Sequence, residues 1–267
     1  MTSDKLNIFC VTNKTISHIE KSNYKIAGVG KGSFPDTYLK SNTLNNIFYK
    51  EEYYSELTFH YWYWKNLLKF SDNNWVGFCQ RRRFWIKSSS SKDIISKENI
   101  KEHLLVEPDN DWNKYQSIIC KPISVAGAKK LKILKRGWRS LIKNPSILFN
   151  EEKQNIKLHF DMHHGYGNLE RAIDLLDEED KNDFNNYVIN NSIFNPHIMF
   201  IAKKDILNKW FSKLFPWLEK CENQFGFDNL KGYDTKRLYA FLAERYLSFW
   251  FKKYTVYKEH PWVFIDS

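Results

Sequence analysis

Residues Trp75-Val76-Gly77-Phe78-Cys79 run directly into Gln80-Arg81-Arg82-Arg83-Phe84-Trp85. The first five residues form a short apolar run, which is typical of a strand buried in a sheet. This run ends in a cluster of positive charges. Ligands of α/β proteins bind outside the carboxyl ends of such strands, so we expect chemistry at this junction.

The arginines at the junction are suited to a phosphate group. Guanidinium groups bind phosphate in a bidentate manner and keep their charge when they are partly buried. Neighbouring strand residues point to opposite faces, so at most two of the arginines Arg81, Arg82 and Arg83 reach one site. The sequence therefore predicts phosphate binding here, with a solvated loop of incidental charge as the alternative.

The elements on either side of this strand predict an α/β fold. Asn7–Thr12 is a first apolar strand, and Glu51–Phe70 is a helix whose apolar residues recur at three- and four-residue steps. Lys21–Asn46 between them is an irregular loop. Further short strands are expected at Leu104–Val106, Ser117–Ile119 and His197–Ala202. This alternation predicts a mixed, mostly parallel central sheet with helices on both faces.

The last third of the chain is richer in helices, which we expect to flank the sheet. The expected helices of the second half are Lys129–Lys143, Asn168–Leu176, Glu178–Asn190, Lys203–Glu222 with an interruption at Pro216, and Lys236–Phe251. There is no internal repeat or low-complexity linker, so we predict a single domain over residues 1–267.

Composition narrows the class of protein. The chain has 267 residues, a formal net charge of +10 and 17% aromatic residues, which excludes a disordered chain. Nucleic acid, an anionic membrane surface or a phosphorylated small molecule would each suit a basic aromatic protein. The sequence carries no nucleic-acid-binding signature, so we expect no nucleic acid partner.

The expected location is the cytoplasm. The start of the sequence has no secretory signal, and no run approaches the roughly 20 apolar residues that span a bilayer. The cysteines are scattered without a Cys-x-x-Cys pair, which predicts free thiols in a reducing compartment. They are Cys10, Cys79, Cys120 and Cys221.

Histidines and an aspartate are concentrated at His159-Phe160-Asp161-Met162-His163-His164-Gly165-Tyr166-Gly167-Asn168. An aspartate with nearby histidines can act as an acid or base, or hold a metal, although the spacing fits no standard zinc motif. The glycines predict a loop that approaches a ligand and then opens a helix. The alternative is a capped helix start with surface histidines.

Two further motifs that contain carboxylates are interpreted as structural, with ligand binding as the alternative. Glu244-Arg245 lies inside a long helix, where such residues are normally paired with each other, and ligand contact is the alternative. Asp109-Asn110-Asp111 could hold a divalent ion through its oxygen ligands. Because no clear strand runs into it and Pro108 precedes it, we interpret it as a turn.

A basic segment carries much of the net charge. Leu131, Leu134 and Trp138 are interleaved with cations, which resembles a helix that lies on a membrane surface or binds a polyanion. The cations are Lys129, Lys130, Lys132, Lys135, Arg136 and Arg139. A solvated basic face is the alternative.

Several stretches together resemble a known family, and they occur in the family's order. They are Ile8–Lys14, Ser55–Asn66, Val76–Phe84, Phe194–Ile201, and Arg237 with Phe241–Tyr246. On these residues the chain resembles the bacterial capsule and O-antigen glycosyltransferase family catalogued as domain of unknown function 4422. The family usually has His where this chain has Asn13, and Tyr where it has Arg81.

This resemblance implies a GT-A-like fold and an enzyme that uses a nucleotide sugar. The expected reaction moves a hexose such as galactose from a UDP-sugar to a growing surface polysaccharide or a lipid-linked glycan. Residues 1–125 would mainly bind the nucleotide sugar and residues 126–267 the acceptor. The enzyme would work at the inner face of the cytoplasmic membrane. The alternative is a non-catalytic protein of the same fold that binds a polyanion or a membrane surface.

The resemblance also suggests roles for the residues singled out above. Arg82 and Arg83 would neutralise the departing nucleoside diphosphate in place of a metal, so no metal ligand is assigned, while manganese or magnesium dependence stays open. The expected nucleotide-sugar contacts are Thr12, Lys14, Gln80, Arg81, Arg82 and Arg83. The expected catalytic residues are Asp161, His163 and Glu244. The expected acceptor contacts are His164, Tyr166, Asn195 and His197. Tyr166 and Trp85 are expected to stack on a sugar or base.

Overall fold

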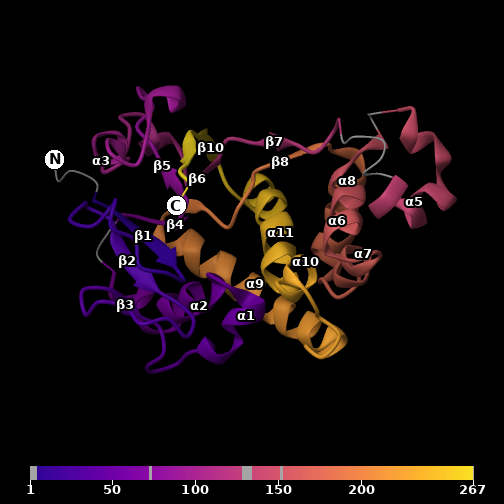
Figure 1. Ribbon diagram of the computed structural model, residues 1–267, viewed down its shortest axis with the longest axis horizontal. Helices are drawn as coiled ribbons and strands as arrows, with labels where there is room; N and C mark the ends of the chain where they lie inside the picture. Colours follow the sequence, from indigo (N-terminus) through magenta and orange to yellow (C-terminus); the bar gives the residue numbers. More distant parts are fainter. Residues whose placement is uncertain (1–4, 72–73, 128–133, 151–152, 267) are drawn as a thin grey trace. The chain divides into compact units, whose positions relative to one another are not determined.

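The computed structural model describes residues 5–71, 74–127, 134–150 and 153–266 (Figure 1). The chain forms two compact units that alternate along the sequence. Unit 1 comprises residues 1–121, 197–213 and 250–267, and unit 2 comprises residues 122–196 and 214–249. The expected α/β architecture is confirmed: unit 1 holds a central mixed sheet, and unit 2 is mainly helical.

In the described residues, unit 1 is built on a nine-stranded sheet of order β10-β6-β9-β4-β1-β2-β3, with β5 and β11 paired alongside β4. The strands are β1 (Leu6–Thr12), β2 (Lys25–Gly28), β3 (Leu39–Lys40), β4 (Trp75–Gln80), β5 (Arg83–Trp85), β6 (Ser117–Cys120), β9 (Phe200–Ala202), β10 (Tyr257–His260) and β11 (Trp262–Phe264). β1 pairs in parallel with both β2 and β4, whereas β9 is antiparallel to β4 and β6. The carboxyl ends of β1, β2 and β4 therefore share one edge of the sheet.

Several expected strands differ from the observed ones. The loop expected over Lys21–Asn46 contains β2 and β3, whose apolar runs are too short to stand out from the sequence. The strand expected at Leu104–Val106 is reduced to a single bridge between Leu104 and Ile86. The strand expected from His197 begins only at Phe200, because His197 has a φ of 68°, which is not extended backbone.

The helix expected over Glu51–Phe70 is divided at Ser55, whose φ of 50° interrupts the helical path. Its parts are α1 (Glu51–Tyr54), α2 (Leu57–Asn66) and a 3₁₀ turn at Leu68–Phe70. α2 packs on β1 and β4 through aromatic rings, with the Tyr63 ring centroid 4.9 Å from that of Phe9 and 5.5 Å from that of Phe78. This aromatic layer covers one face of the sheet.

The opposite face of the sheet is covered by apolar residues that include Ile100, Leu104 and Trp112. Trp85 also belongs to this cluster and is fully buried, with its indole N–H donating to the Phe78 carbonyl at 3.0 Å. The expectation that Trp85 stacks on a ligand is therefore wrong. Its strand turns the ring into the core, and a short sequence run cannot reveal which face of a strand is buried.

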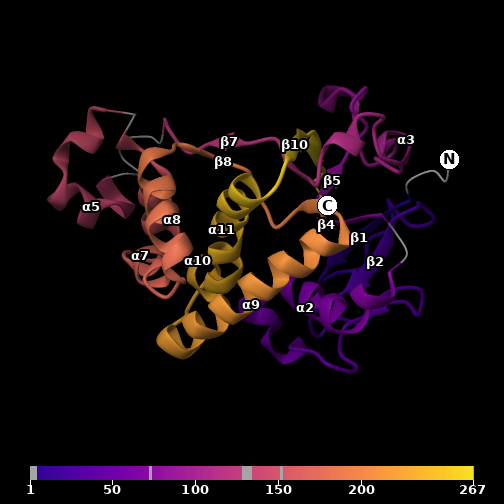
Figure 2. The same cartoon turned by 180° about the vertical axis from the view of Figure 1, so that it is seen from behind.

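Unit 2 is built from helices with a small two-stranded sheet, β7 (Ile123–Ser124) and β8 (Ile193–Phe194). Its helices include α5 (Trp138–Lys143), α6 (Ile156–His164), α7 (Asn168–Ile173), α8 (Glu178–Asn190) and α10 (Tyr233–Lys236). α6, α7 and α8 lie side by side (Figures 1 and 2). Residues 159–164 form the end of α6. Gly165 and Gly167, where the sequence predicts a loop that opens a helix, make the turn into α7 with φ of 99° and 76°.

Two long helices, α9 (Lys204–Phe225) and α11 (Leu238–Tyr254), have residues in both units. The expected interruption at Pro216 is wrong, because α9 continues through it. The fixed φ of proline is compatible with a helix even though its missing N–H removes one hydrogen bond. The basic helix expected over Lys129–Lys143 is described from residue 134 onward, and Lys129, Lys130, Leu131 and Lys132 lie outside the described residues.

Candidate functional site

The ends of β1 and β4 lie next to each other at one edge of the sheet in unit 1. Val11 is paired with Gln80, and the backbone N–H of Arg81 donates to the Val11 carbonyl at 3.2 Å. Because the two strands are parallel, the segment after β1 and the arginines after β4 leave the sheet at the same place. The sequence-predicted residues Thr12 and Arg81 are thus brought together.

The segment after β1 turns tightly around the Thr12 side chain. The Thr12 hydroxyl accepts a hydrogen bond from the backbone N–H of Lys14 at 3.1 Å and donates to the Lys14 carbonyl. The Thr12 carbonyl also accepts from the N–H of Val29 at 2.9 Å, which holds the loop after β2 against this turn. Thr12 itself is buried and Lys14 is exposed. The Lys14 side chain is therefore open to solvent, whereas Thr12 mainly shapes the turn.

A glycine of the loop after β2 permits a close approach. Gly30 has a φ of 79°, and a Cβ there would lie 2.9 Å from a carboxylate oxygen of Glu51 in α1. Any larger residue would be strained by its backbone and would displace that carboxylate. The sequence predicted only an irregular loop here, but the structure joins this loop, the Thr12 turn and α1 at one edge.

Gln80 connects the arginines to α2. Its amide nitrogen donates to the Glu56 carboxylate, and its amide oxygen accepts from Arg83 Nη1 at 3.3 Å. Arg83 is the first residue of β5, so the chain reverses direction between Gln80 and Arg83. This tight reversal keeps the guanidinium of Arg83 beside the end of β4.

Arg82 and Arg83 are held by one aromatic ring. Their guanidinium carbons lie 5.2 and 5.4 Å from the centroid of the Phe264 ring, within the range of a cation–π contact. Arg82 also pairs with the exposed Asp266 at 3.6 Å. All three arginines stay partly exposed, which leaves charge at the surface for an anion. Strand alternation does not apply to this pair, because Arg81 and Arg82 lie in a turn and only Arg83 belongs to a strand. Whether at most two of the arginines reach one ligand site stays a prediction.

Glu56 is a residue that the sequence reasoning did not assign to the site. It follows the interruption at Ser55, where the buried Ser55 adopts a φ of 50° and its carbonyl accepts from the Thr58 hydroxyl at 2.8 Å. This kink starts α2 beside Gln80. The signal that could have found it is the Ser55-Glu56-Leu57-Thr58 segment, which lies within one of the stretches that carry the family resemblance.

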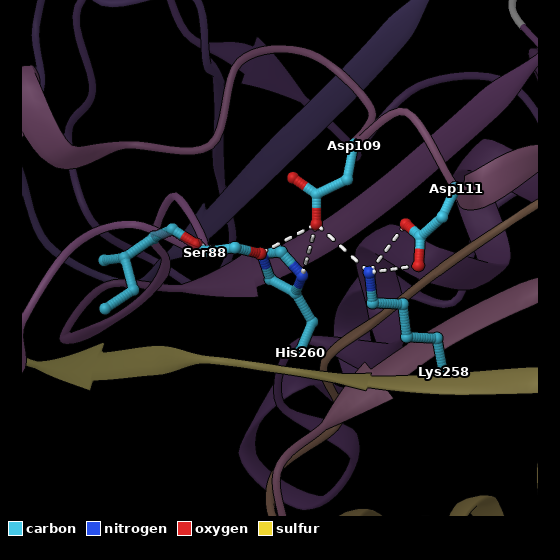
Figure 3. A network of polar contacts seen from close by, with 6 residues as sticks. Ser88, Asp109, Asp111, Lys258 and His260 are labelled. Atoms are coloured by element: carbon cyan, nitrogen blue, oxygen red, sulfur yellow. Dashed lines mark hydrogen bonds and ion pairs between the residues drawn. The ribbon is translucent and has the colours of Figure 1, made fainter.

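The residues at the end of β4 do not fit a divalent metal ion, because the strand ends in an amide and three cations. No group of three or more His, Cys, Asp or Glu residues that could hold a metal occurs among the described residues. The Asp109-Asn110-Asp111 motif is engaged elsewhere. Lys258 Nζ lies 2.7 Å from an Asp111 carboxylate oxygen and 3.3 Å from Asp109 (Figure 3).

Figure 3 shows Asp109 at the centre of a polar network in unit 1. Its carboxylate accepts from the Ser88 hydroxyl at 2.7 Å and lies 3.7 Å from the Nδ1 of the buried His260. Burial opposes ionisation of Asp109, but Ser88, His260 and Lys258 together lower its pKa. Burial opposes the charge of Lys258 too, yet its bonds to Asp111 and Asp109 raise its pKa. The motif is confirmed as a turn, in which a lysine neutralises both carboxylates.

In unit 2, a polar pocket of about 490 Å³ lies over one face of α6. Asp161 and Tyr166, both predicted from the sequence, line it together with Lys143, Lys157 and several amide side chains. The amides belong to Asn144, Asn150, Asn155 and Asn190. Amides, a carboxylate and an aromatic ring are groups that bind hydroxyl-rich molecules, and the lysines favour an anionic one.

Asp161 is a buried acid and, among the described residues, the one carboxylate that lines this pocket. Its Oδ1 accepts from the Gly167 N–H at 3.0 Å, and its Oδ2 lies 3.7 Å from Lys157 Nζ. Burial raises the pKa of Asp161, while Gly167 and Lys157 oppose the rise. A carboxylate with a raised pKa is a better proton acceptor, which suits a general base.

His163 lies on the other side of α6 from Asp161. Two residues along a helix are separated by about 200° of rotation, so the two side chains point to nearly opposite faces. The His163 Nδ1 is 2.9 Å from the His159 carbonyl, and the two imidazole rings are stacked at 4.5 Å. Asp161 and His163, predicted as alternative bases, are therefore not brought together.

The second face of α6 meets the Glu244–Arg245 pair of α11. Arg245 is almost completely buried, donates to Glu244 and to the His159 Nδ1 at 3.2 Å, and lies 4.0 Å from the Phe194 ring centroid. Burial and the nearby Arg245 lower the pKa of His159 to about 2. The predicted structural pairing is confirmed, and it shows Glu244 engaged with a buried cation.

The other predicted acceptor residues lie in different surroundings. The His164 ring stacks on Phe241 at 3.7 Å, and burial lowers the pKa of His164 to about 4. Asn195 is fully buried and accepts from the Ser248 hydroxyl at 2.7 Å. His197 belongs to unit 1, where its ring meets Trp262 edge-on at 4.7 Å. Only Tyr166 of the predicted acceptor contacts lines the pocket, and the roles of the others stay predictions.

The chain belongs to the family described as Domain of unknown function (DUF4422), whose profile matches residues 7–255. Its fold is similar to that of a solved structure titled as the apo form of the WbbM bifunctional glycosyltransferase, with a TM-score of 0.74 and 20% sequence identity. That similarity covers 98% of this chain and 46% of the other, so this chain spans less than half the length of that protein. The expected glycosyltransferase fold and the family resemblance are confirmed.

A second solved structure, the mannosyltransferase Ktr4p from S. cerevisiae, has a TM-score of 0.26 and 10% identity, over 82% of this chain and 62% of that one. A similarity at this level carries no argument. No curated protein matches the chain. None of the helices in the described part of the chain is both long and apolar enough to cross a membrane.

Proposed function

We propose that this chain is a glycosyltransferase that moves a hexose, such as galactose, from a UDP-sugar to a growing surface polysaccharide or lipid-linked glycan. The observation that carries the proposal is the cationic edge at the ends of β1 and β4, where Arg81–Arg83 leave the sheet beside Thr12 and Lys14. Ligands of α/β sheets bind at this edge, and a nucleoside diphosphate supplies the matching charge. The fold shared with a protein titled as a bifunctional glycosyltransferase is further support.

The chemistry of transfer explains why cations are needed. The bond between the sugar's anomeric carbon and the diphosphate oxygen breaks, and a bond to an acceptor oxygen forms. Negative charge grows on the leaving diphosphate, and preorganised positive groups stabilise it. Arg82 and Arg83 would supply that charge, and Gln80 would hold Arg83 in place through its hydrogen bond. Lys14 would contact the nucleotide.

The acceptor is proposed to bind in the polar pocket of unit 2. In an inverting transfer the acceptor hydroxyl loses its proton as its oxygen attacks, and Asp161 would take that proton. Its burial and its raised pKa support this role. Tyr166 would provide a ring surface for the sugar, and the amides would bind its hydroxyls.

Calorimetric titration of the full chain with UDP, UMP and uridine tests the donor site directly. We expect affinity to rise from uridine to UMP to UDP, because each phosphate adds charge for the arginines. The titrations are repeated with EDTA and with added manganese. UDP binding that is lost with EDTA and restored by manganese would contradict the assignment of Arg82 and Arg83 in place of a metal.

Turnover is then measured with UDP-galactose and other UDP-hexoses, following UDP release in the presence of glycan acceptors. UDP release that depends on one hexose and on an acceptor supports the transferase. No response to any nucleotide would favour the alternative, a non-catalytic protein of the same fold that binds a polyanion or a membrane surface.

A further inference from the structure

The segment that includes α5 exposes apolar side chains at regular steps. Leu134, Trp138 and Ile142 are 48%, 51% and 72% exposed, and they are spaced four residues apart. Residues 134–136 are helical and α5 follows directly after Gly137. At about 100° per residue, side chains four apart in a helix lie within about 40° of each other, so Trp138 and Ile142 of α5 share one face. Leu134 is exposed in the helical residues just before Gly137 and extends this apolar stripe along the sequence. Single exposed apolar residues are ordinary, whereas a stripe that includes a tryptophan marks an interaction surface.

The side of α5 next to this stripe is basic. Lys135, Arg136, Arg139 and Lys143 are all exposed. The Arg139 guanidinium lies 5.3 Å from the Trp138 ring centroid, and Lys143 Nζ lies 5.5 Å from that of Tyr166. The cations are therefore held close to the aromatic rings that accompany them.

No acid is present in this part of the sequence to balance the charge. Residues 112–150 contain no Asp or Glu, so the basic stripe is not neutralised from its own segment. Arg136 pairs with Asp234 of α10 at 3.5 Å, and both side chains of that pair are about half exposed. A surface pair of this kind is weak and leaves the segment strongly positive.

One side of α5 packs against α6 within unit 2. Leu141 packs with Ile147, Leu158 and Met162 in a small apolar cluster that joins α5 to α6. Leu141 therefore anchors the helix, while Trp138 and Ile142 stay outside that cluster. An amphipathic helix with an outward apolar stripe, a tryptophan and flanking Lys and Arg has the features of a helix that lies in a membrane interface.

We propose that this α5 surface, formed by Leu134, Trp138 and Ile142 with Lys135, Arg136, Arg139 and Lys143, docks on an anionic lipid bilayer. The apolar side chains would enter the boundary between headgroups and acyl chains, where tryptophan is favoured, and the cations would pair with lipid phosphates. A polyanion such as nucleic acid would pair with the cations but would give no reason for the exposed Trp138 and Ile142. The proposal does not depend on glycosyl transfer.

Docking through α5 would also bring a membrane-bound substrate to unit 2. α5 contributes Ser140 and Lys143 to the polar pocket that contains Asp161. A glycan attached to a lipid through phosphate would thus find cations at the pocket and a bilayer at the neighbouring stripe. This arrangement fits a lipid-linked acceptor better than a free sugar.

The test is sedimentation of the full chain with vesicles. One set contains phosphatidylglycerol and phosphatidylcholine in equal parts, and the other contains phosphatidylcholine alone. We expect binding to the anionic vesicles that weakens as salt is raised, and little binding to the neutral ones. Equal binding to both sets, or binding to neither, would overturn the proposal.

Two pairs of variants separate the apolar and the charged contributions. Trp138→Ser with Ile142→Ser should weaken vesicle binding roughly tenfold, whereas Leu44→Ser with Phe70→Ser, which are also exposed, should not change it. Arg139→Gln with Lys143→Gln should weaken it similarly, unlike Lys97→Gln with Lys114→Gln. All the replaced side chains are exposed, so a thermal melt close to that of the unmodified chain verifies folding.

Heparin binding, measured with the same variants, tests the alternative that the α5 surface binds a polyanion. A polyanion-binding surface would bind heparin with a loss in Arg139→Gln with Lys143→Gln, and its vesicle binding would not change in Trp138→Ser with Ile142→Ser. That second result would overturn the membrane proposal, because it would show that the apolar stripe does not contact lipid.

Discussion

The side-chain amide of Gln80 donates a hydrogen bond to the carboxylate of Glu56, which joins the end of β4 to the start of α2. The same amide group accepts from Arg83, so a carboxylate in a helix helps to orient a guanidinium at a strand end. The orientation depends on the kink at Ser55, which begins α2 at this point.

Replacing Glu56 with Gln tests whether Glu56 orients Arg83 through Gln80. The amide can no longer hold Gln80 by a charge-assisted bond, so Arg83 loses part of its support. We expect UDP to bind about three- to tenfold more weakly, as measured by calorimetry. Glu98→Gln, an exposed change elsewhere in unit 1, is the matched control. Unchanged UDP affinity in Glu56→Gln would show that Arg83 is oriented without the hydrogen bond between Glu56 and Gln80.

The arginines themselves are tested by Arg82→Ala and Arg83→Ala. Each change removes a charged donor to the diphosphate, which we expect to weaken UDP binding at least about tenfold. Uridine binding should be nearly unaffected, because uridine carries no phosphate. Arg171→Ala, an exposed arginine of unit 2, serves as control. Equal losses for UDP and uridine would indicate a general disturbance of the edge instead of lost phosphate contacts.

Asp161→Asn tests the proposed base. Asparagine retains an oxygen that can accept from the Gly167 N–H, but it cannot take a proton. We expect kcat for transfer to fall about a hundredfold or more while UDP affinity stays the same. Asp174→Asn, a largely exposed acid of unit 2, should keep its activity. If His163→Gln abolishes turnover and Asp161→Asn does not, the base lies on the other face of α6.

The pH dependence of turnover gives a second test of Asp161. Burial raises its pKa above the usual 3.8, so the carboxyl group becomes protonated at a higher pH than an exposed aspartate does. Because the base must be ionised, kcat should rise with pH through this raised pKa and then level off. Asp161→Asn should lose that acidic limb, whereas Asp174→Asn should keep it.

The buried imidazole of His60 is expected to make the stability of the protein depend on pH. It is buried among Phe78, Phe200 and Phe211, and burial lowers its pKa from 6.5 to about 3. Between those values the unfolded chain binds the proton and the folded chain does not. Stability is therefore full above pH 6.5 and falls as the pH drops, by roughly 1.4 kcal/mol per pH unit for this one group.

Replacing His60 with Leu removes this titration. The variant should lose less stability than the unmodified chain between pH 6.5 and 4.5, as measured by urea unfolding. His103→Gln, at a less buried position, should leave the slope unchanged. An identical slope in His60→Leu would mean that the other histidines whose pKa values burial lowers account for the acid sensitivity. They are His18, His159, His164 and His260.

Removal of the Lys258 cation is expected to lower the stability of the protein. Lys258→Met leaves the carboxylates of Asp109 and Asp111 without their shared cation, and we expect a loss of about 1 kcal/mol, or a melting temperature lower by about 2–4 °C. Lys114→Met, an exposed change, should not affect the melt. Recovery of the variant by manganese would show that these carboxylates can bind a metal once the lysine is gone.

Much of the cationic edge at the ends of β1 and β4 could be predicted from the sequence, because its signals are local. An apolar run followed by arginines indicates a strand end, and β1 and β4 occur close to their expected positions. Glu56 could not be assigned in this way. Its contact with Gln80 depends on the backbone at Ser55, a non-glycine residue at positive φ, and no short-range pattern predicts that conformation.

The histidine cluster shows a second limit of prediction from the sequence, which concerns the direction of side chains. The sequence places Asp161, His163 and His164 within four residues, but the helix that contains them turns Asp161 toward the pocket and His163 away from it. The glycines at 165 and 167 predict a loop that opens a helix, and the turn from α6 into α7 does lie at these two residues. A high density of reactive side chains in the sequence therefore indicates a region to examine, but the helix decides the face to which each side chain points.

The position of β9 constrains the order in which the protein can be completed during synthesis. β9 begins at Phe200, yet it lies between β4 and β6, which precede it by more than a hundred and by about eighty residues. Until the ribosome has made β9, the edge of β4 that it will cover is open, and β6 has neither of its neighbours, since β10 comes later still. Nascent chains that stall before Phe200 would expose an unpaired, apolar strand edge, which is a template for aggregation. We therefore expect chaperones that cover this edge until β9 is made to raise the yield of soluble protein.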